Sequence, residues 1–377
     1  MRYFTLIALT SISLSCQKND KDHSTNDLLY SVDTVIIDSK GRLLDLDTYF
    51  NKSDLDAEES SIFLYNKFDH SIDEINLKNL EFMNNHPFEA EGPDGTGESV
   101  HYLNLLNDTS IFIKAFNGSA VFNQNGVLLK KIDWIKSVDS TGIKFGEIPQ
   151  NEIAIGPSEL KVFGLTYDNR NREVFLDVLS VKDNTVKRYD IDSKNSYHNF
   201  VLAIDDPKNY SFADPYVFLN SENNMVLVSH QYSNEIFMFN SEGEYVHTVE
   251  YETKMTPKRV KDLNGINITT WEQLREEYQH FSEQVRFGPP VWDSLNKQYL
   301  RLSAVRIFSD ILKEDSMLPE IKEISVYLSV FDEEFNLVSE LAIGELSSEY
   351  IKYFAKDGKL WVFQNFSDEL GFIIIDI

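Results

Sequence analysis

The sequence predicts an all-β protein folded as a six-bladed β-propeller, with a seven-bladed ring as the alternative. Three observations lead to this expectation: a short apolar segment that recurs six times, Asp and Asn residues at fixed positions before it, and Gly-Pro or Asp-Pro pairs between the copies. The 26 Phe and 18 Tyr agree with it, because aromatic side chains favour pleated, half-buried strands.

The recurring segment ends in three consecutive apolar residues, with Arg301 as the one exception, as expected for a strand buried on both faces. The copies are Ser60–Leu64, Thr109–Ile113, Arg172–Leu176, Asn224–Val228, Lys297–Arg301 and Gly358–Val362. Three residues before this final triplet, each copy has an Asp, Asn or Glu, and four copies carry a further Asp or Asn three residues earlier. Asp and Asn side chains bond their own backbone, so this D-x-x-N spacing predicts a hairpin turn.

Two further recurrences complete one blade. Three strands are predicted to end in a second kind of turn, at Phe122–Gly126, Phe239–Gly243 and Phe331–Phe335. Proline breaks the chain before a new strand at Gly92-Pro93, Gly156-Pro157, Asp214-Pro215 and Gly288-Pro289. Together the signals predict four antiparallel strands per blade.

The ring is expected to close through the two ends of the chain. Phe372–Ile377 reads as the third strand of the last blade, and Val32–Ile37 can supply the missing fourth strand. Pairing the two segments removes an open sheet edge, which a propeller avoids.

One segment breaks the β pattern. Thr270-Trp271-Glu272-Gln273 reads as a capping box, and Trp271, Leu274, Tyr278, Phe281 and Val285 follow at helical spacing, so we expect a helix near 270–285 between blades four and five. Its apolar stripe is expected to pack on the propeller, and docking of a partner is the alternative. A second insertion, 309–322, is predicted to be a loop.

The N-terminus predicts an exported, lipidated protein. Residues 1–15 have a positive charge followed by a short apolar run, as in a signal peptide, and Cys16 is the single cysteine of the chain. Residues 16–28 are polar and charged and read as the lipidated cysteine and a flexible tether, which leaves 29–377 as one propeller domain. The alternative is an ordinary secreted protein with an unused thiol.

Composition excludes several classes of partner and chemistry. The net charge of −26 argues against binding to nucleic acid or electrostatic adhesion to anionic lipid. The eight histidines show no metal-ligand spacing, and the sequence contains no G-x-S-x-G, H-E-x-x-H or complete phosphate-loop motif. We therefore predict no cofactor, no metal and no catalytic residue.

If a binding site exists, it should line the face where the crossovers between blades and the loops between second and third strands meet. The residues predicted to lie there are His70, Asn117, His230, Tyr232, Arg301, Arg306 and Asn365. Arg301 is unusual because it replaces an apolar residue of the recurring segment. It is expected either to meet a carboxylate in a structural ion pair or to reach the central channel as an anchor for an anionic ligand.

Two parts of the sequence resemble known patterns. Cys16–Asp20 resembles the surface-export signal of Bacteroidota lipoproteins, and Phe88–Gly95 and Val291–Arg301 are similar to segments of the lipoprotein family called domain of unknown function 4221. The resemblance covers nearly the whole mature chain. It implies a propeller-like fold and an outer-membrane, lipid-anchored protein exposed at the cell surface, and it implies no chemistry.

These observations predict a non-catalytic surface propeller that binds a glycan or an envelope protein. The alternative is a propeller enzyme, a lyase or hydrolase acting on a carbohydrate or lactone. A structural or sensory role beside another envelope protein is a third hypothesis, which an apolar patch on the helix containing Trp271 would favour.

Overall fold

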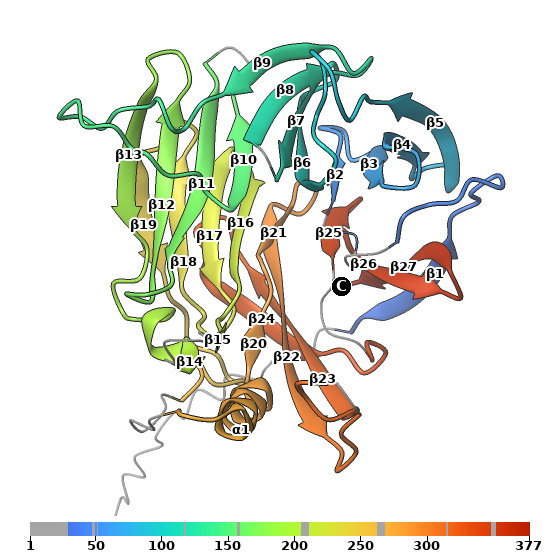
Figure 1. Ribbon diagram of the computed structural model, residues 1–377. Helices are drawn as coiled ribbons and strands as arrows, with labels where there is room; N and C mark the ends of the chain where they lie inside the picture. Colours follow the sequence, from blue (N-terminus) through green and yellow to red (C-terminus); the bar gives the residue numbers. More distant parts are fainter. Residues whose placement is uncertain are drawn as a thin grey trace, which may run out of the picture.

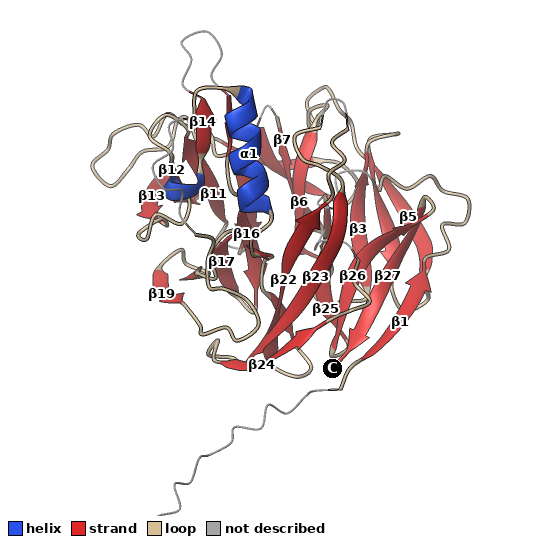
Figure 2. Cartoon of the chain, turned by 90° about the horizontal axis from the view of Figure 1, so that it is seen from below, coloured by secondary structure: helices blue, strands red, loops and turns tan. Residues whose placement is uncertain are grey.

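The computed structural model describes residues 29–377 except 47–49, 51, 117, 157–158, 205–210, 262–267, 314–315 and 348–351. Within these residues six antiparallel sheets, five of four strands and one of five, follow one another around a common axis (Figures 1 and 2). A channel lined by all six sheets runs along this axis. The predicted six-bladed propeller is confirmed, and the seven-bladed alternative is wrong. The predicted signal peptide and tether, residues 1–28, lie outside the described residues.

Each blade runs from an innermost strand at the channel to an outer strand at the rim. The innermost strands are β2 (Ser53–Leu55), β6 (Val100–Asn107), β10 (Asn151–Ile155), β16 (Val217–Glu222), β21 (Val291–Asp293) with β20 (Arg286–Phe287), and β25 (Tyr353–Lys356). The second strands are β3 (Ser61–Asn66), β7 (Ser110–Ala115), β11 (Lys161–Asp168), β17 (Met225–His230), β22 (Gln298–Phe308) and β26 (Lys359–Phe366). The third strands are β4 (Ser71–Asn76), β8 (Gly118–Asn123), β12 (Glu173–Ser180), β18 (Ile236–Asn240), β23 (Ile321–Phe331) and β27 (Glu369–Asp376). The outer strands are β5 (Glu81–Pro87), β9 (Leu128–Ile132), β13 (Thr185–Asp190), β19 (Tyr245–Val249), β24 (Leu337–Ala342) and β1 (Ser31–Ile36).

The recurring segment predicted from the sequence lies in the second strand of five blades. In the third blade, Arg172–Leu176 lies in β12, the third strand, so the predicted alignment of this copy is wrong. The turn before it is the predicted one: Asp168 Oδ1 accepts hydrogen bonds from the N–H groups of Arg170 and Asn171, both at 3.0 Å. Asp293 Oδ1 accepts from Leu295 and Asn296 in the same way. The same turn can join the first and second strands of a blade or its second and third strands. It therefore predicts a hairpin but does not tell which two strands of the blade form it.

The predicted closure by the chain ends is confirmed. β1 pairs with β27 in antiparallel register from Ser31 opposite Asp376 to Ile36 opposite Gly371. The chain then crosses to the first blade, where the N–H of Asp38 donates to Leu80 O and its carbonyl accepts from the N–H of Phe82, both at 2.8 Å. β1 therefore belongs to the last blade, and the residues after it bind the first.

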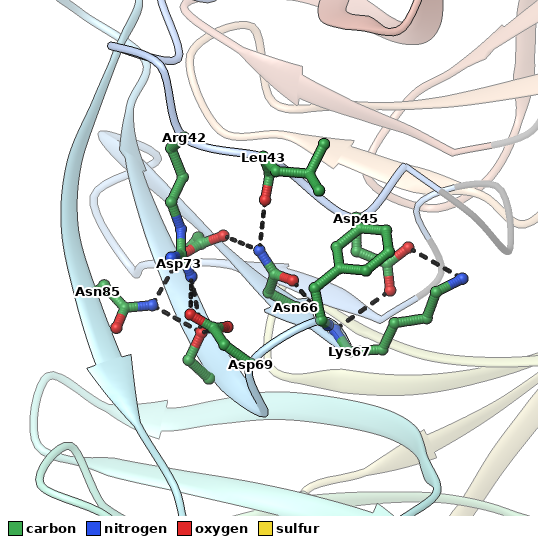
Figure 3. A network of polar contacts seen from close by, with 10 residues as sticks. Arg42, Leu43, Asp45, Asn66, Lys67, Asp69, Asp73 and Asn85 are labelled. Atoms are coloured by element: carbon green, nitrogen blue, oxygen red, sulfur yellow. Dashed lines mark hydrogen bonds and ion pairs between the residues drawn. The ribbon is translucent and has the colours of Figure 1, made fainter.

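A polar network binds the residues that follow β1, among them Arg42, to the first blade (Figure 3). The side chain of Asp73 on β4 is fully buried and accepts from Arg42 Nε at 2.9 Å and from Asn66 Nδ2 at 2.7 Å. Asn85 Nδ2 adds a bond to the same carboxylate at 2.9 Å, and Arg42 also pairs with Asp69 at 2.7 Å. Because the buried carboxylate has a full set of donors, its burial carries little uncompensated cost.

Two insertions stand on one face of the ring. The loops between second and third strands and the crossovers between blades lie on this face, which we call the crossover face. Helix α1 (Trp271–Ser282) and the 3-10 turn η2 (His198–Phe200) lie there with the ribbon of β14 (Leu202–Ile204) and β15 (Ser211–Ala213). Figure 1 shows β22 and β23 extending beyond the other blades beside α1. The predicted loop of the second insertion is found at 309–313 and 316–320.

The helix forms where the capping box predicts it. Thr270 Oγ1 accepts from the N–H of Gln273 at 3.2 Å, and Leu274, Phe281 and Val285 are buried against Phe200, Leu202 and Tyr232. The helix thus packs on the propeller as predicted, although Trp271 at its start is 55 % exposed.

Candidate functional site

The central channel is a cavity of about 1890 Å³ that is lined by residues of all six blades. Its wall consists of the six innermost strands, and its lining continues to Arg286, Arg306 and Lys322 on the crossover face. In strands that line a water-filled channel, the side chains that reach the lumen can be polar, and here many of them are.

Several of these polar side chains bind the backbone of the next blade. Asn104 Nδ2 donates to Ala154 O at 2.7 Å while its Oδ1 accepts from the N–H of the same residue at 3.0 Å. Asp54 accepts from the N–H of Leu105 at 2.8 Å. Glu222 accepts from the N–H of Trp292 at 2.9 Å. These bonds satisfy the free edges of the short innermost strands and join neighbouring blades.

Three charged groups lie together within the channel: Asp54, Glu222 and Lys352. Lys352 Nζ donates to Ser53 O at 3.0 Å. All three side chains are half-buried, because they touch the lumen while protein encloses their other sides. Burial raises the pKa of Asp54, and it raises the pKa of Glu222 to about 7. Burial lowers the pKa of Lys352, although both carboxylates act in the opposite direction. The channel therefore holds groups that could exchange protons near neutral pH.

The opening at the crossover face combines aromatic and cationic side chains; we call it the mouth and define it by Tyr102, Asp214, Tyr216, Tyr278, Arg286, Arg306, Lys322 and Glu323. The hydroxyl groups of Tyr102 and Tyr216 lie 2.9 Å apart, which links the second blade to the fourth past β10. Tyr216 is 40 % exposed, and its ring lies 4.7 Å from that of Phe218. Burial raises the pKa of Tyr102, so both hydroxyl groups remain neutral and can donate or accept.

Of the seven residues predicted for the mouth, Arg306 lines it. His230, Tyr232 and Arg301 lie in the interior, each 1 % exposed or less. His230 Nε2 donates to Ile191 O at 2.8 Å, and burial lowers its pKa, so this histidine links two blades as a neutral group. The ring of Tyr232 lies 5.7 Å from those of Phe200 and Phe281, beneath α1. The three side chains stabilise the fold and do not reach the lumen.

Arg301 meets neither of the two expected environments. Its Nε donates to Gly288 O at 2.8 Å, and Nη1 donates to Asn234 O at 2.9 Å and to the Tyr251 hydroxyl at 3.2 Å. The guanidinium carbon lies 4.9 Å from the Phe287 ring centre. No carboxylate lies within ion-pair distance among the described residues, so the expected ion pair and the expected channel position are both wrong. Backbone carbonyl groups and a ring face replace the counter-ion because the guanidinium can distribute its charge over several donors.

His70 lies in the loop between β3 and β4, and Asn365 lies near the end of β26; both are on the crossover face, where they stabilise turns. His70 contacts the Tyr65 hydroxyl through Nδ1 at 2.8 Å and Thr96 Oγ1 through Nε2 at 2.6 Å. Asn365 Oδ1 accepts from the N–H of Asp368 at 2.7 Å. Asn117 lies outside the described residues.

Sequence reasoning missed the residues that line the channel. The predicted repeat was anchored on the buried second strands, whereas the channel is lined by the innermost ones. A signal was present in the second blade, where polar and apolar residues alternate in Tyr102-Leu103-Asn104-Leu105, just before the turn at Asp108. A period of two is typical of a strand with one side exposed to water.

Two absences hold for the described part of the chain. No group of three or more His, Cys, Asp or Glu side chains is placed to hold a metal ion there. No helix in the same residues is long and apolar enough to cross a membrane.

The fold and the channel define the chain as a six-bladed propeller whose channel is lined by both polar and apolar side chains. The sequence profile of the family described as domain of unknown function (DUF4221) matches residues 25–342, and the chain belongs to this family. Among solved structures, a DUF4221 member from Bacteroides vulgatus ATCC 8482 is similar to it, with a TM-score of 0.63 and 12 % identity over 92 % of this chain and 98 % of the other. A protein from Bacteroides fragilis NCTC 9343, whose name predicts that it is exported, has a TM-score of 0.53 and 10 % identity over 94 % and 97 % of the two chains. No curated protein matches the chain in sequence. At these identities the likeness to the two structures shows the fold alone.

Proposed function

We propose that the protein is an exported lipoprotein, anchored through Cys16 at the outer surface of the outer membrane, whose channel binds a glycan without changing it. One observation carries the ligand site: a channel of about 1890 Å³ opens between the two insertions on the crossover face. Loops and insertions around a rigid scaffold are where binding residues concentrate.

The chemistry of the mouth supports a sugar. A sugar ring presents an apolar C–H face and a rim of hydroxyl groups, and it therefore needs a flat apolar surface beside donors and acceptors. Tyr216 and Phe218 both line the channel, and with their rings tilted by 58° to each other, either ring can supply such a flat face. Deeper in the lumen, the carboxylates of Asp54 and Glu222 can accept hydrogen bonds from hydroxyl groups.

The anchor is supported by the residues before the propeller. Cys16 follows a short apolar run, and a structural relative carries a name that predicts export. We expect Cys16→Ser to move the protein from the membrane fraction to the soluble fraction while its melting temperature stays the same. Detergent partitioning of the two forms measures this, and an unchanged distribution would contradict lipidation.

Glycan binding can be tested by removing the two mouth tyrosines. The full-length protein, purified in detergent, is screened against a glycan panel, and hits are titrated by calorimetry. We expect Tyr102→Ala with Tyr216→Ala to lose binding and Tyr245→Ala, an exposed tyrosine on outer strand β19, to keep it. Binding that survives the double variant would place the ligand elsewhere, and a screen that finds an envelope protein but no glycan would favour a protein ligand.

A second candidate function, an enzyme acting on a carbohydrate or lactone, is favoured by Asp54, Glu222 and Lys352. A carboxyl group with a pKa of about 7 beside a second carboxylate is suited to proton transfer at neutral pH. Chromatography of each bound glycan after long incubation tests this candidate. A new product that disappears in Glu222→Gln would replace the binding proposal with an enzymatic one.

A further inference from the structure

Asp54, Glu222 and Lys352 bring charge from three blades together inside the channel, and all three line the cavity. Asp54 lies on β2 of the first blade, Glu222 ends β16 of the fourth, and Lys352 directly precedes β25 of the sixth. The first and fourth blades stand opposite each other in a ring of six. Even so, burial raises the pKa of Glu222 and the charge of Asp54 raises it further, so the two carboxylates act on each other across the lumen. A ligand on the channel axis can therefore meet groups from both sides.

The protein gives these groups hydrogen bonds but does not pair their charges. Asp54 and Glu222 each accept from a backbone N–H of the next blade, at 2.8 and 2.9 Å, and Glu222 also accepts from Asn220 Nδ2 at 3.3 Å. Lys352 Nζ donates to Ser53 O, which uses one of its three N–H groups. Among the described residues no direct ion pair joins this lysine to either carboxylate. Both carboxylates and the ammonium group therefore keep hydrogen-bonding capacity for a ligand.

The channel at this level lacks positive charge and donors. One ammonium group faces two carboxylates. Burial raises the pKa of Asp54 and lowers the pKa of Lys352, although each group acts on the other in the opposite direction. Acceptors are also in excess, because Asn220 Oδ1, on the same strand as Glu222, is buried and no described group donates to it. A ligand that brings a cation with N–H donors would stabilise both carboxylates.

The depth of the three charged groups favours a ligand with the shape of a chain. Tyr216 at the mouth directly precedes β16, and Glu222 ends this strand six residues later, which at about 3.3 Å per residue is roughly 20 Å. A short oligosaccharide can cover this span, with one sugar face on Tyr216 and its other end beside the carboxylates. The net charge of the chain, −26, attracts cationic ligands and repels anionic ones.

We propose that the glycan bound in this channel carries a protonated amino group, as in glucosamine, and that Asp54 and Glu222 bind this ammonium group from opposite sides. Lys352 then donates to a neighbouring hydroxyl oxygen of the sugar. This inference rests on the proposed function and names the class of glycan. An ammonium group has three N–H donors, and its charge-assisted bonds to carboxylates are roughly twice as strong as neutral ones. A hydroxyl or acetamide group in the same place offers one neutral donor.

The test compares three tetrasaccharides with the same β-1,4-linked backbone, built from glucosamine, N-acetylglucosamine or glucose. They differ in the group at C2, which is an ammonium, an acetamide or a hydroxyl group. Full-length protein in detergent is titrated with each by calorimetry at neutral pH. We expect the glucosamine tetramer to bind at one site per chain and the other two to bind at least tenfold more weakly. Equal or tighter binding of either uncharged tetramer would overturn the inference.

Asp54→Asn with Glu222→Gln removes both charges but keeps the size of each side chain and an oxygen that can accept the backbone N–H. The variant should therefore fold, which its melting temperature checks. We expect it to bind the glucosamine tetramer at least tenfold more weakly and to lose the preference among the three probes. Glu58→Gln is the matched control, because Glu58 lies exposed in the turn after β2 and does not line the cavity. Unchanged binding by the double variant would show that surface charge holds the amine, and would overturn the inference.

The same titrations separate this inference from the proposed function. If an uncharged glycan binds at least as tightly as the glucosamine tetramer and depends on Tyr102 and Tyr216, the proposed function stands and this inference fails. If no glycan binds, both fail.

Discussion

Arg301 is a fully buried cation that the fold accommodates through neutral groups. It lies between the fourth and fifth blades, where carbonyl oxygens from both blades and the Tyr251 hydroxyl accept its hydrogen bonds. The single arginine thus takes the place of several separate contacts between blades. A side chain without donors would leave these carbonyl groups unsatisfied in the interior.

We predict that Arg301→Leu lowers the free energy of unfolding by about 3–5 kcal/mol, because buried acceptors lose charged donors. Arg301→Lys should recover part of the loss, since an ammonium group can reach fewer of the carbonyl groups. Denaturant titration of both variants gives the values, with exposed Arg170→Leu as the control that should change stability by less than about 0.5 kcal/mol. Equal stability of Arg301→Leu and wild type would show that the bonds contribute nothing.

Glu222 links the stability of the propeller to pH. Its folded-state pKa of about 7 lies above the usual value of about 4.3 for an unfolded chain. Between these two pH values the Glu222 carboxyl group is protonated in the folded state and ionised in the unfolded chain. Its contribution to the free energy of unfolding is therefore fully present below about pH 4.3 and is lost as the pH rises through about 7. The carboxylate touches channel water, which reduces the effect to about 1 kcal/mol.

We compare the melting temperature of Glu222→Gln with that of wild type at pH 5 and at pH 8. The difference should shift in favour of the variant by roughly 2–4 °C between pH 5 and pH 8, because only the wild type has to ionise a buried carboxyl group. Glu58→Gln, an exposed site, should show no such change between the two pH values. Thermal melts across this pH range provide the measurement. A constant difference between Glu222→Gln and wild type would mean that the carboxyl group titrates as in an unfolded chain.

At the scale of elements, the turn between third and outer strands is the best-defined local motif. Asn123 and Asn240 each accept from the N–H groups two and four residues later, and a strand register shift follows in each hairpin. The glycines of these turns have positive φ, 76° for Gly126 and 78° for Gly243. The predicted bulged hairpin is confirmed, and it shows why glycine is favoured there.

Gly243→Ala should destabilise the protein by more than the roughly 1 kcal/mol of a left-handed alanine alone. An added Cβ would lie 2.5 Å from a methyl carbon of Val178 on β12, so the alanine would also push the fourth blade from the third. Gly344→Ala is the control, because no atom lies within 4 Å of its Cβ position and its φ is not in the left-handed region. Denaturant titration of both variants separates the two effects. A loss no larger at Gly243 than at Gly344 would contradict the close approach.

For the whole molecule, the sequence predicted the fold well because the repeat is enforced by hydrogen bonding and burial in every blade. Four features could be predicted because each needs particular residue types at fixed spacings in the sequence. They are the D-x-x-N turns, the bulged hairpins, the helix cap at Thr270 and the pairing of the chain ends. The channel was not predictable in the same way. Asn104, Asp54 and Glu222 bind backbone groups of the next blade, and such groups are present at every residue, so no sequence pattern marks the partner. The environment of Arg301 depends on carbonyl groups, which every residue has and no pattern marks.

Closure of the ring is the property on which the whole propeller depends. Without β1, β27 would keep its bonds to β26 and present an open edge, and the network around Asp73 would lose the segment that carries Arg42. Deleting 31–38 should therefore lower the melting temperature by roughly 10 °C or more and promote association through the free edge. Deleting 17–28, which precede the described residues, should change neither property. Calorimetry and light scattering on the two deletions decide the matter, and a peptide of residues 29–46 added to the first should restore part of its stability. Similar melting temperatures for the two deletions would mean that the sheets hold the ring together without the N-terminal strand.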